Sequence, residues 1–301
     1  MLKPAFFLMT GSVMWGISWI PLNALSSIGI DGLWLLFISH GVLAALLVLY
    51  LKTKRKSSLA AIPLGDALMM AFAGGGAIVL FTLAVMYGKV IMVMALFFLL
   101  PVWGSLLGWR FLGESMTALR AGNAIMAVIG AWLVLGHLKI VSEPPGIYEL
   151  MGLAAGFLFA VNNVAFRRTQ SVDLETKTSM MFIGCSGLAL VGVLAGQVLG
   201  LGTGLEQTPI SQISVSAYAW LLLYTFSYVL IANLLSQYGV THLENGTAAI
   251  LIVTELIAAV ISTLILRGNA LDLLNWVGCA LITLAALSEG LRLLKQGPPA
   301  D

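Results

Sequence analysis

Long apolar runs separated by short polar or charged breaks extend along the whole chain. Most of these runs approach the roughly 20 residues that an α-helix needs to cross the hydrocarbon core of a bilayer. The longest breaks, about 52–65 and 200–215, are too short for a soluble domain. We therefore expect an all-α integral membrane protein whose activity lies within its helices. The ten predicted transmembrane helices are approximately 5–25, 32–51, 66–87, 90–111, 117–136, 148–167, 177–199, 216–238, 243–266 and 274–293.

The composition agrees with this pattern and excludes other classes of protein. Of the 301 residues, 60% are apolar and 9% are charged, whereas about a quarter of the residues of a soluble domain are charged. A soluble enzyme, a nucleic-acid-binding protein and a secreted disulfide-bonded domain are therefore excluded. The net charge of +2 gives no reason to expect a polyanionic partner.

Sequence motifs for cofactors, metals and nucleophilic catalysis are absent. The chain has no GxxxxGK[ST] loop, no HExxH motif and no GxSxG motif. Its two cysteines, Cys185 and Cys279, lie within apolar runs, and neither has a CxxC partner. We therefore expect no cofactor, no metal and no nucleic acid. The partners that remain are a small-molecule substrate and membrane lipid.

Basic residues are distributed unequally between the two sides of the predicted topology. With the N-terminus inside, twelve of the 15 Lys and Arg residues lie in or beside cytoplasmic loops, and three (Lys89, Lys139 and Arg267) lie outside. Cytoplasmic loops of membrane proteins carry an excess of Lys and Arg. The bias predicts that both termini are cytoplasmic. We expect a multi-pass protein of a bacterial inner (plasma) membrane. A miscounted span would remove the bias, so the bias also supports the number ten.

Two parts of the chain resemble each other at a constant spacing. Pro101 in span four and Leu256 in span nine are 155 positions apart, and so are Gly113 and Gly268 at the ends of these spans. Spans one and six correspond at an offset of 144. An odd number of spans makes the second unit enter the membrane from the opposite side, and inverted repeats place a binding site near the midplane. The two predicted five-helix units are residues 1–139 and 140–301.

Several short motifs of the first unit occur together in a known family. They are Trp15-Gly16, Leu100-Pro101, Gly113-Glu114, Gly122 and Gly130. This combination resembles the EamA pattern of the drug/metabolite transporter superfamily, and the resemblance covers essentially the whole chain as two units. The second unit departs from it, with Glu255-Leu256 in place of Glu-Pro and Gly268-Asn269 in place of Gly-Glu. The resemblance implies a ten-helix carrier of small organic metabolites, often an exporter of amino acids or toxic compounds.

One carboxylate, Glu255, lies near the middle of span nine, about eleven residues from either end. A charged group at that depth is costly in hydrocarbon, so it should face a cavity or a partner. In one interpretation Glu255 is the counter-ion of a substrate ammonium or a proton-coupling carboxyl. In the other it makes a hydrogen bond between helices that fixes their packing.

Three other polar side chains inside the spans are candidates for substrate binding. Asn162 and Asn163 lie in the middle of span six, where hydrocarbon cannot satisfy their amide groups. Their side chains point about 100° apart on a helix, so we expect one in the substrate pathway and the other between helices. His40 lies about a third of the way into span two. A packing role is the alternative for each of these residues.

Aromatic residues are the last group of binding candidates. Trp15 and Trp19 lie one turn apart in span one, and Tyr224 and Tyr228 lie one turn apart in span eight. Such rings can form an aromatic wall for an amphipathic or cationic substrate through stacking or cation–π contact. Trp103, two residues after Pro101, is a further candidate. For these residues too, simple packing is the alternative.

Three residues around the end of span four are candidates for gating. Pro101 breaks the backbone ladder and can kink or hinge the helix. Glu114 begins the following turn, with Arg110 one helical turn before it and Arg120 across the turn. We expect an ion pair of Glu114 to latch the cytoplasmic face.

Together these features predict a secondary transporter that works by alternating access and exports amino acids or amine-containing compounds. Efflux of organic cations or of many drugs is one alternative, and a channel-like facilitator is another. A membrane-embedded enzyme is a third, although Glu255 lacks an obvious catalytic companion. Proton coupling is open, and so is the choice between a monomer and a homodimer.

Overall fold

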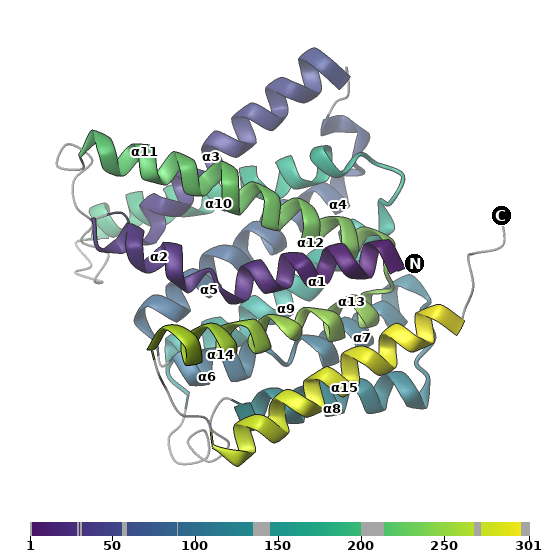
Figure 1. Ribbon diagram of the computed structural model, residues 1–301. Coiled ribbons are helices and arrows are strands. Elements are labelled where there is room, and N and C mark those ends of the chain that lie inside the picture. The colour runs from purple at the N-terminus through teal and green to yellow at the C-terminus, as the bar shows by residue number, and fades with distance from the viewer. Residues whose placement is uncertain are drawn as a thin grey trace.

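The computed structural model describes residues 2–28, 30, 32–55, 59–88, 90–134, 145–199, 214–267 and 272–295. Within these residues the regular secondary structure is helical throughout, which confirms the all-α expectation. Many of the helices lie side by side in a bundle (Figure 1). The start of α1 and the end of α15 lie at the same end of this bundle, which we call the termini end (Figure 1).

The helices follow the order of the predicted spans, with several spans divided into consecutive pieces. The α-helices are α1 (Leu2–Gly16), α2 (Trp19–Ser26), α3 (Gly32–Tyr50), α4 (Leu64–Leu68), α5 (Gly75–Tyr87), α6 (Val90–Phe97), α7 (Leu100–Leu112), α8 (Ala118–Val134), α9 (Ile147–Arg168), α10 (Leu174–Leu199), α11 (Val215–Tyr224), α12 (Leu230–His242), α13 (Asn245–Ile252), α14 (Thr254–Arg267) and α15 (Leu273–Lys295). Short π-helices are η1 (Leu51–Arg55), η3 (Met69–Gly74) and η5 (Thr225–Val229), and η2 (Leu59–Ala61) is a 3-10 helix.

Seven helical segments of the described chain are long and apolar enough to cross a membrane. They are Lys3–Ser26, Gly32–Thr53, Leu64–Val85, Ile147–Arg168, Leu174–Gly196, Val215–His242 and Asn245–Leu266. The apolar helices Ala118–Val134 and Leu273–Glu289 are shorter, and predicted span four consists of α6 and α7. The protein is therefore a multi-pass membrane protein, and the count of ten spans stays a prediction.

Two of the breaks within predicted spans have a proline as their cause. Pro21 in α2 has no N–H to offer the carbonyl of Ile17, which instead accepts a hydrogen bond from the N–H of Ile20. Pro101 near the start of α7 interrupts the ladder between α6 and α7 in the same way. The predicted kink at Pro101 thus lies at the junction of two short helices.

The break between α13 and α14 has no proline. The N–H of Val253 bonds to the carbonyl of Ile250, and the N–H of Leu256 bonds to the carbonyl of Val253. The hydroxyl of Thr254 donates to the carbonyl of Leu251 at 2.7 Å. These short-range bonds replace the regular α-helical ones, because a threonine hydroxyl competes for backbone acceptors.

The helix irregularities recur at the spacing found in the sequence. The break after α6 includes Phe98 and the break after α13 is at Val253, positions that are 155 residues apart. The π-helices η3 and η5 end at Gly74 and Val229, which are also 155 residues apart. Backbone irregularities in helices are frequently associated with functional sites.

Helix α1 lies between α12 and α14 (Figure 1). A Cβ atom on Gly16 would collide with the carbonyl oxygen of Glu255 and approach the side chain of Ala258. Only glycine therefore allows α1 to approach α14 this closely, as small residues do at helix contacts in membranes. This contact fixes the break after α1 beside the break before α14.

Candidate functional site

The structure describes two separate polar regions that involve predicted site residues. The first, called the Glu255 site, consists of Trp15, Trp19, Tyr224, Tyr228 and Glu255. The second lies at the termini end and is called the end cluster. It consists of Glu114, Arg120, Asn123, Glu244, Thr247, Glu289 and Arg292.

Glu255 stands in the first turn of α14, directly after the break at Val253. The unpaired N–H groups of a helix start favour a negative charge there, which offsets part of the cost of placing it in the protein interior. In the described chain the Glu255 carboxylate takes part in none of the side-chain ion pairs or hydrogen bonds. The side chain is partly accessible rather than buried.

Three aromatic rings lie together beside Glu255. The rings of Tyr224 and Tyr228 stack with centroids 5.5 Å apart and planes at 19°. The ring of Trp15 meets Tyr228 edge-on, with centroids 6.5 Å apart. Tyr228 is close enough to Glu255 to interact with it electrostatically. The structure therefore brings Trp15, Tyr224 and Tyr228 together, with Tyr228 near Glu255, and their role in substrate binding stays a prediction.

The hydroxyl of Tyr228 also donates a hydrogen bond to the carbonyl of Met14, near the end of α1. The helix ends two residues later, and this carbonyl accepts a backbone hydrogen bond from the N–H of Ile17 at 3.2 Å in place of the regular one from Ser18. The Tyr228 hydroxyl is a second donor to the same carbonyl, and such a hydrogen bond contributes about 1 kcal/mol. Tyr228 therefore stabilises the broken end of α1 while its ring faces Trp15.

Trp19 joins the same region from α2. Its indole N–H donates to the Oγ of Ser262 at 3.0 Å, and the Ser262 hydroxyl donates to the carbonyl of Ala259 at 2.9 Å. Ser262 was not among the sequence candidates. It lies seven residues after Glu255, which places it on the same face of α14.

Asn162 and Asn163 lie in a different part of the interior. Both are fully buried, and the Nδ2 of Asn162 is 3.5 Å from the Oδ1 of Asn163. Asn162 approaches Gly74 of η3 and the side chain of Met181, and the amide of Gln237 donates to the sulfur of Met181 at 3.7 Å. The Oδ1 of Asn162 and the Nδ2 of Asn163 have no hydrogen-bond partner. These two buried polar atoms are therefore unsatisfied within the described chain, which is uncommon in protein interiors.

His40 and Trp103 each occupy their own surroundings. The Nδ1 of His40 is 3.0 Å from the Oγ of Ser39, its ring lies edge-on to Phe182, and its Nε2 is unpartnered. The ring of Trp103 lies edge-on to Phe157 at 5.6 Å, and its Nε1 is unpartnered. These contacts do not join either residue to Glu255. Their roles in binding stay predictions.

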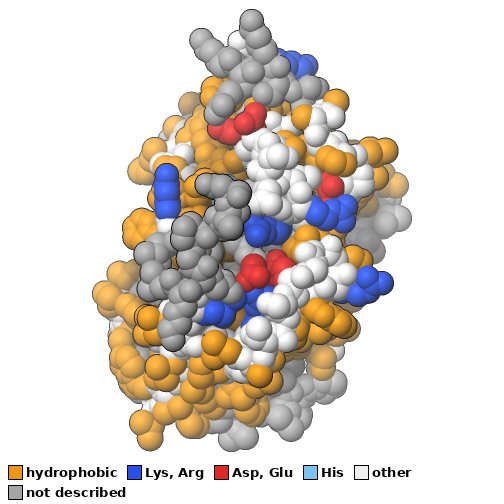
Figure 2. All heavy atoms as spheres, turned by 90° about the vertical axis from the view of Figure 1, so that its right-hand side faces the viewer, with side chains coloured by type: hydrophobic (Ala, Val, Ile, Leu, Met, Phe, Trp, Pro, Cys, Tyr) orange, Lys and Arg blue, Asp and Glu red, His pale blue; other side chains and the backbone are white. Residues whose placement is uncertain are grey.

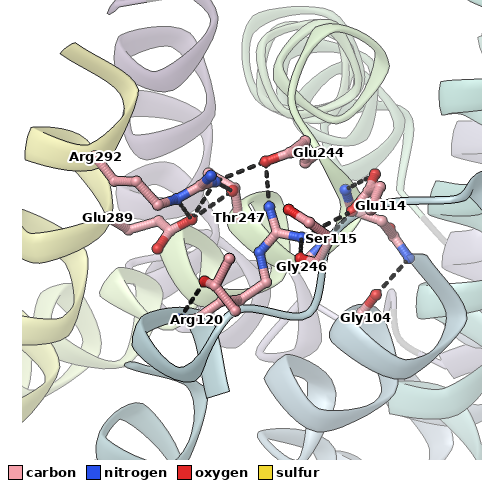
Figure 3. Close-up of polar contacts among 11 residues, drawn as sticks. Gly104, Glu114, Ser115, Arg120, Glu244, Gly246, Thr247, Glu289 and Arg292 are labelled. Atoms are coloured by element: carbon pink, nitrogen blue, oxygen red, sulfur yellow. Dashed lines mark hydrogen bonds and ion pairs between the residues drawn. The ribbon is translucent and has the colours of Figure 1, made fainter. Parts of the chain in front are cut away.

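In the end cluster, Glu114 caps the start of α13 (Figure 3). Its carboxylate accepts hydrogen bonds from the N–H of Asn245 at 2.6 Å and of Gly246 at 3.4 Å. Arg120 is its ion-pair partner at 3.6 Å, whereas the exposed Arg110 lies over the ring of Phe111. Burial raises the pKa of Glu114, and the N–H of Asn245 opposes this increase. Of the two predicted arginines, Arg120 thus makes the pair.

A chain of alternating charges extends from Arg120 to α15 (Figure 3). Glu244 pairs with Arg120 and, at 2.7 Å, with Arg292. Arg292 pairs with Glu289 at 2.6 Å. The hydroxyl of Thr247 and the amide of Asn123 also donate to Glu289, at 2.6 and 3.0 Å. The cluster thereby ties α8, α13 and α15 together.

Charged side chains also gather on the surface of the termini end. Figure 2 shows acidic and basic side chains gathered near the middle of the termini end, with hydrophobic side chains toward its edges. Sequence reasoning missed Glu244, Glu289 and Arg292. The signal for Glu289 was present, because it is a carboxylate within an apolar helix, as Glu255 is.

Lys177 is a further residue that the sequence reasoning missed as a site candidate. The side chain is fully buried near the start of α10. Its Nζ donates to the carbonyl of Phe166 at 3.2 Å and to the hydroxyl of Thr241 at 2.9 Å. A lysine that reaches the last turn of a helix can satisfy carbonyls that have no helical partner, as Lys177 does for Phe166 at the end of α9. Lys177 therefore joins the end of α9 to α10 and α12.

The broken helices and the carboxylate inside the bundle define a class of protein, the multi-pass helical carriers with an internal polar site. Residues 2–136 match the model of the EamA-like transporter family. The chain thus carries an EamA unit of the drug/metabolite transporter superfamily in its first half, which confirms the family resemblance there. The second EamA-like unit stays a prediction. This family consists of transporters, so the protein is a transporter of small molecules in a lipid membrane.

The likeness to solved structures extends over the whole chain. A solved structure titled "Crystal structure of protein" superposes with a TM-score of 0.76 over 96% of this chain and 98% of its own length, at 15% sequence identity. At that identity the likeness concerns the fold alone. The search of curated proteins gave no significant match.

Proposed function

We propose that the protein is a secondary transporter that exports amino acids or other amine-containing metabolites by alternating access. The observation that carries this proposal is the partly accessible Glu255 carboxylate, which lacks a cationic partner in the described chain and lies beside three aromatic rings. An ionised carboxylate inside a membrane protein needs a counter-charge. A substrate ammonium supplies that charge.

Alternating access requires two units that move relative to each other, and we propose residues 1–139 and 140–301 as these units. The common offset of 155 residues between the two breaks and between the two π-helices supports this division. The end cluster joins both units, because Glu114 and Arg120 belong to the first and Glu244 and Arg292 to the second. We propose that this cluster closes the termini end while the Glu255 site is open toward the other side.

The test of the proposed function is flux through purified protein in liposomes. The proteoliposomes are loaded with one labelled amine or amino acid at a time, and efflux is measured with and without unlabelled compound outside. A carrier gives saturable efflux that the external compound accelerates. Efflux that neither saturates nor accelerates would instead indicate a channel-like facilitator.

Glu255→Gln separates the counter-ion role from a packing role. The matched control is Asp272→Asn, which removes an exposed carboxylate at the start of α15. We expect Glu255→Gln to lose transport at a normal protein level in the membrane, and Asp272→Asn to keep it. Normal transport by Glu255→Gln at all pH values would leave only the packing role.

Efflux of organic cations is the second candidate function. The cluster of Trp15, Tyr224 and Tyr228 favours it, because aromatic faces attract cations whatever else the ligand carries. The same flux measurement with quaternary ammonium compounds tests it. Saturable efflux of these compounds, without efflux of amino acids, would favour this second function.

A further inference from the structure

We infer that Lys177 is a proton-binding site, and that loss of its proton closes the termini end by holding α9, α10 and α12 together. The inference rests on the proposed function only in that the termini end opens and closes during transport. It does not depend on the role of Glu255. It follows from the burial of Lys177, from its two hydrogen-bond acceptors, and from a column of buried polar groups that leads from it into the bundle.

The Lys177 side chain is fully buried without a counter-charge. Its exposed fraction is 0%, and none of the described ion pairs includes it. An ammonium group in such a place has lost its hydration, which costs free energy. The ring of Phe166, whose centroid is 5.3 Å from Nζ, offers the charged form a weak attraction. The site therefore accommodates both forms of the amine.

The hydrogen bonds of Lys177 match those of a neutral amine. Its Nζ donates to the carbonyl of Phe166 at 3.2 Å and to the Oγ1 of Thr241 at 2.9 Å. The Thr241 hydroxyl donates its own hydrogen to the carbonyl of Gln237 at 2.8 Å, so it is an acceptor toward Lys177. A neutral amine has two N–H groups, whereas an ammonium has three. Two acceptors satisfy the neutral form completely and leave one N–H of the ammonium without a partner among the described residues.

The charged groups nearby do not supply the missing counter-charge. Arg167 donates to the carbonyl of Thr241 at 3.2 Å, which places a second positive charge near Lys177 and repels the ammonium. Arg168 pairs with Asp66 at 2.9 Å. The other titratable groups on adjoining turns, none of them in a described ion pair with Lys177, are Asp173, Glu175 and His242.

A column of buried polar groups leads from Lys177 into the bundle. One turn deeper between α10 and α12, the Nε2 of Gln237 is 3.7 Å from the sulfur of Met181, and Asn162 approaches the same methionine. The Oε1 of Gln237, the Oδ1 of Asn162 and the Nδ2 of Asn163 have no partner in the described chain. Water both donates and accepts hydrogen bonds, and buried waters commonly satisfy such groups. Waters along this column give a proton a path between the interior and Lys177.

Protonation of Lys177 changes the packing at the termini end. Helix α12 ends at His242, two residues before Glu244 of the end cluster, so Lys177 lies near this end. The neutral amine joins α9 and α12 to α10, whereas protonation adds a charge and an N–H that water has to satisfy. The protonated form therefore favours separation of the three helices, and the neutral form favours the closed end. The proton moves between water and the lone pair of Nζ, and no other bond changes.

Nuclear magnetic resonance of the detergent-solubilised full chain tests the proton site directly. With isotope-labelled lysine, spectra are recorded from about pH 6 to about pH 9, and the Lys177 signal is identified by its loss in Lys177→Arg or Lys177→Met. We expect this signal to change with pH, while exposed lysines keep the signal of an ammonium because the ordinary pKa of lysine is about 10.4. A Lys177 signal that keeps one form throughout would overturn the inference.

Hydrogen–deuterium exchange tests whether the proton controls the packing. After correction for the intrinsic effect of pH, the ends of α9 and α12 should exchange faster at about pH 6 than at about pH 9 in the wild type. Lys177→Met cannot bind a proton and should lose this difference. Lys52→Met, which removes an exposed lysine of η1, is the matched control and should keep it. An equal difference in Lys177→Met would assign the pH effect to another group and contradict the inference.

Flux measurements separate this inference from the function on which it rests. Liposomes loaded with labelled tryptamine, an aromatic amine of the proposed substrate class, are compared at equal pH and with acid outside. Protein-free liposomes correct for leakage of the free base. We expect external acid to accelerate efflux by the wild type, and this acceleration to be lost in Lys177→Met. Saturable efflux that external acid does not accelerate would overturn the inference and leave the proposed function standing. A titrating Lys177 without carrier-mediated efflux of any amine or amino acid would support the proton site and overturn the proposed function.

Discussion

Glu255 and Glu289 have similar settings in the sequence, since each is a carboxylate within an apolar helix of the second half. Their surroundings differ. Glu289 is fully buried and accepts hydrogen bonds from Thr247, Asn123 and Arg292. Glu255 is partly accessible, and the described chain gives it no cation. The protein itself supplies a cationic partner for Glu289, whereas we propose that a substrate supplies it for Glu255.

The largest expected effect is that of Glu289→Gln on stability. The substitution removes the charge that Arg292 faces within the end cluster, and disruption of a buried charge pair costs about 3 kcal/mol or more. We expect the free energy of unfolding in detergent to fall by about this amount, measured by denaturant titration. Glu255→Gln is the matched comparison. An equal loss in both variants would contradict the distinction between the two carboxylates.

The second largest expected effect is the loss of ligand affinity in Glu255→Gln. Because this carboxylate has no protein partner, its removal should change the free energy of unfolding by less than about 1 kcal/mol. The affinity for tryptamine should fall at least tenfold, which corresponds to about 1.4 kcal/mol. Calorimetry and denaturant titration on the same preparation check both values. Unchanged affinity together with a large loss of stability would assign Glu255 to packing.

The helices and the position of Glu255 within one of them could be predicted from the sequence. Long apolar runs predicted the helices, and a carboxylate within such a run identified Glu255. Pro21 and Pro101 explain two of the breaks, whereas the break at Val253 has no proline to signal it. The partners of a charge could not be predicted, because contacts such as that of Glu114 with Asn245 join residues 131 positions apart. Pattern along one helix does not specify which distant helix lies beside it.

A smaller effect is expected from Tyr228→Phe. The substitution keeps the ring that stacks on Tyr224 and removes the hydroxyl that donates to the carbonyl of Met14. The Met14 carbonyl keeps the hydrogen bond from the N–H of Ile17, so only the contribution of one hydrogen bond is lost. The free energy of unfolding should fall by about 1 kcal/mol or less while tryptamine still binds. Tyr218→Phe, a tyrosine of α11, is the control for a lost hydroxyl. A tenfold loss of tryptamine affinity in Tyr228→Phe would instead make the hydroxyl part of the binding site.

The smallest effect concerns the pH dependence of the end cluster. Burial raises the pKa of Glu114 above the ordinary value of a glutamate, so in the folded protein this carboxyl binds its proton more readily than in the unfolded chain. Its contribution to stability is then largest below the ordinary pKa, and it decreases as the pH rises through the raised pKa. Melting temperatures between about pH 4 and pH 8 should therefore fall with rising pH less steeply in Glu114→Gln than in the wild type. Identical slopes would contradict the assignment. The pH-dependent change in the free energy of unfolding should be smaller than the loss expected for Tyr228→Phe, because Arg120 and the N–H of Asn245 counteract the effect of burial on Glu114.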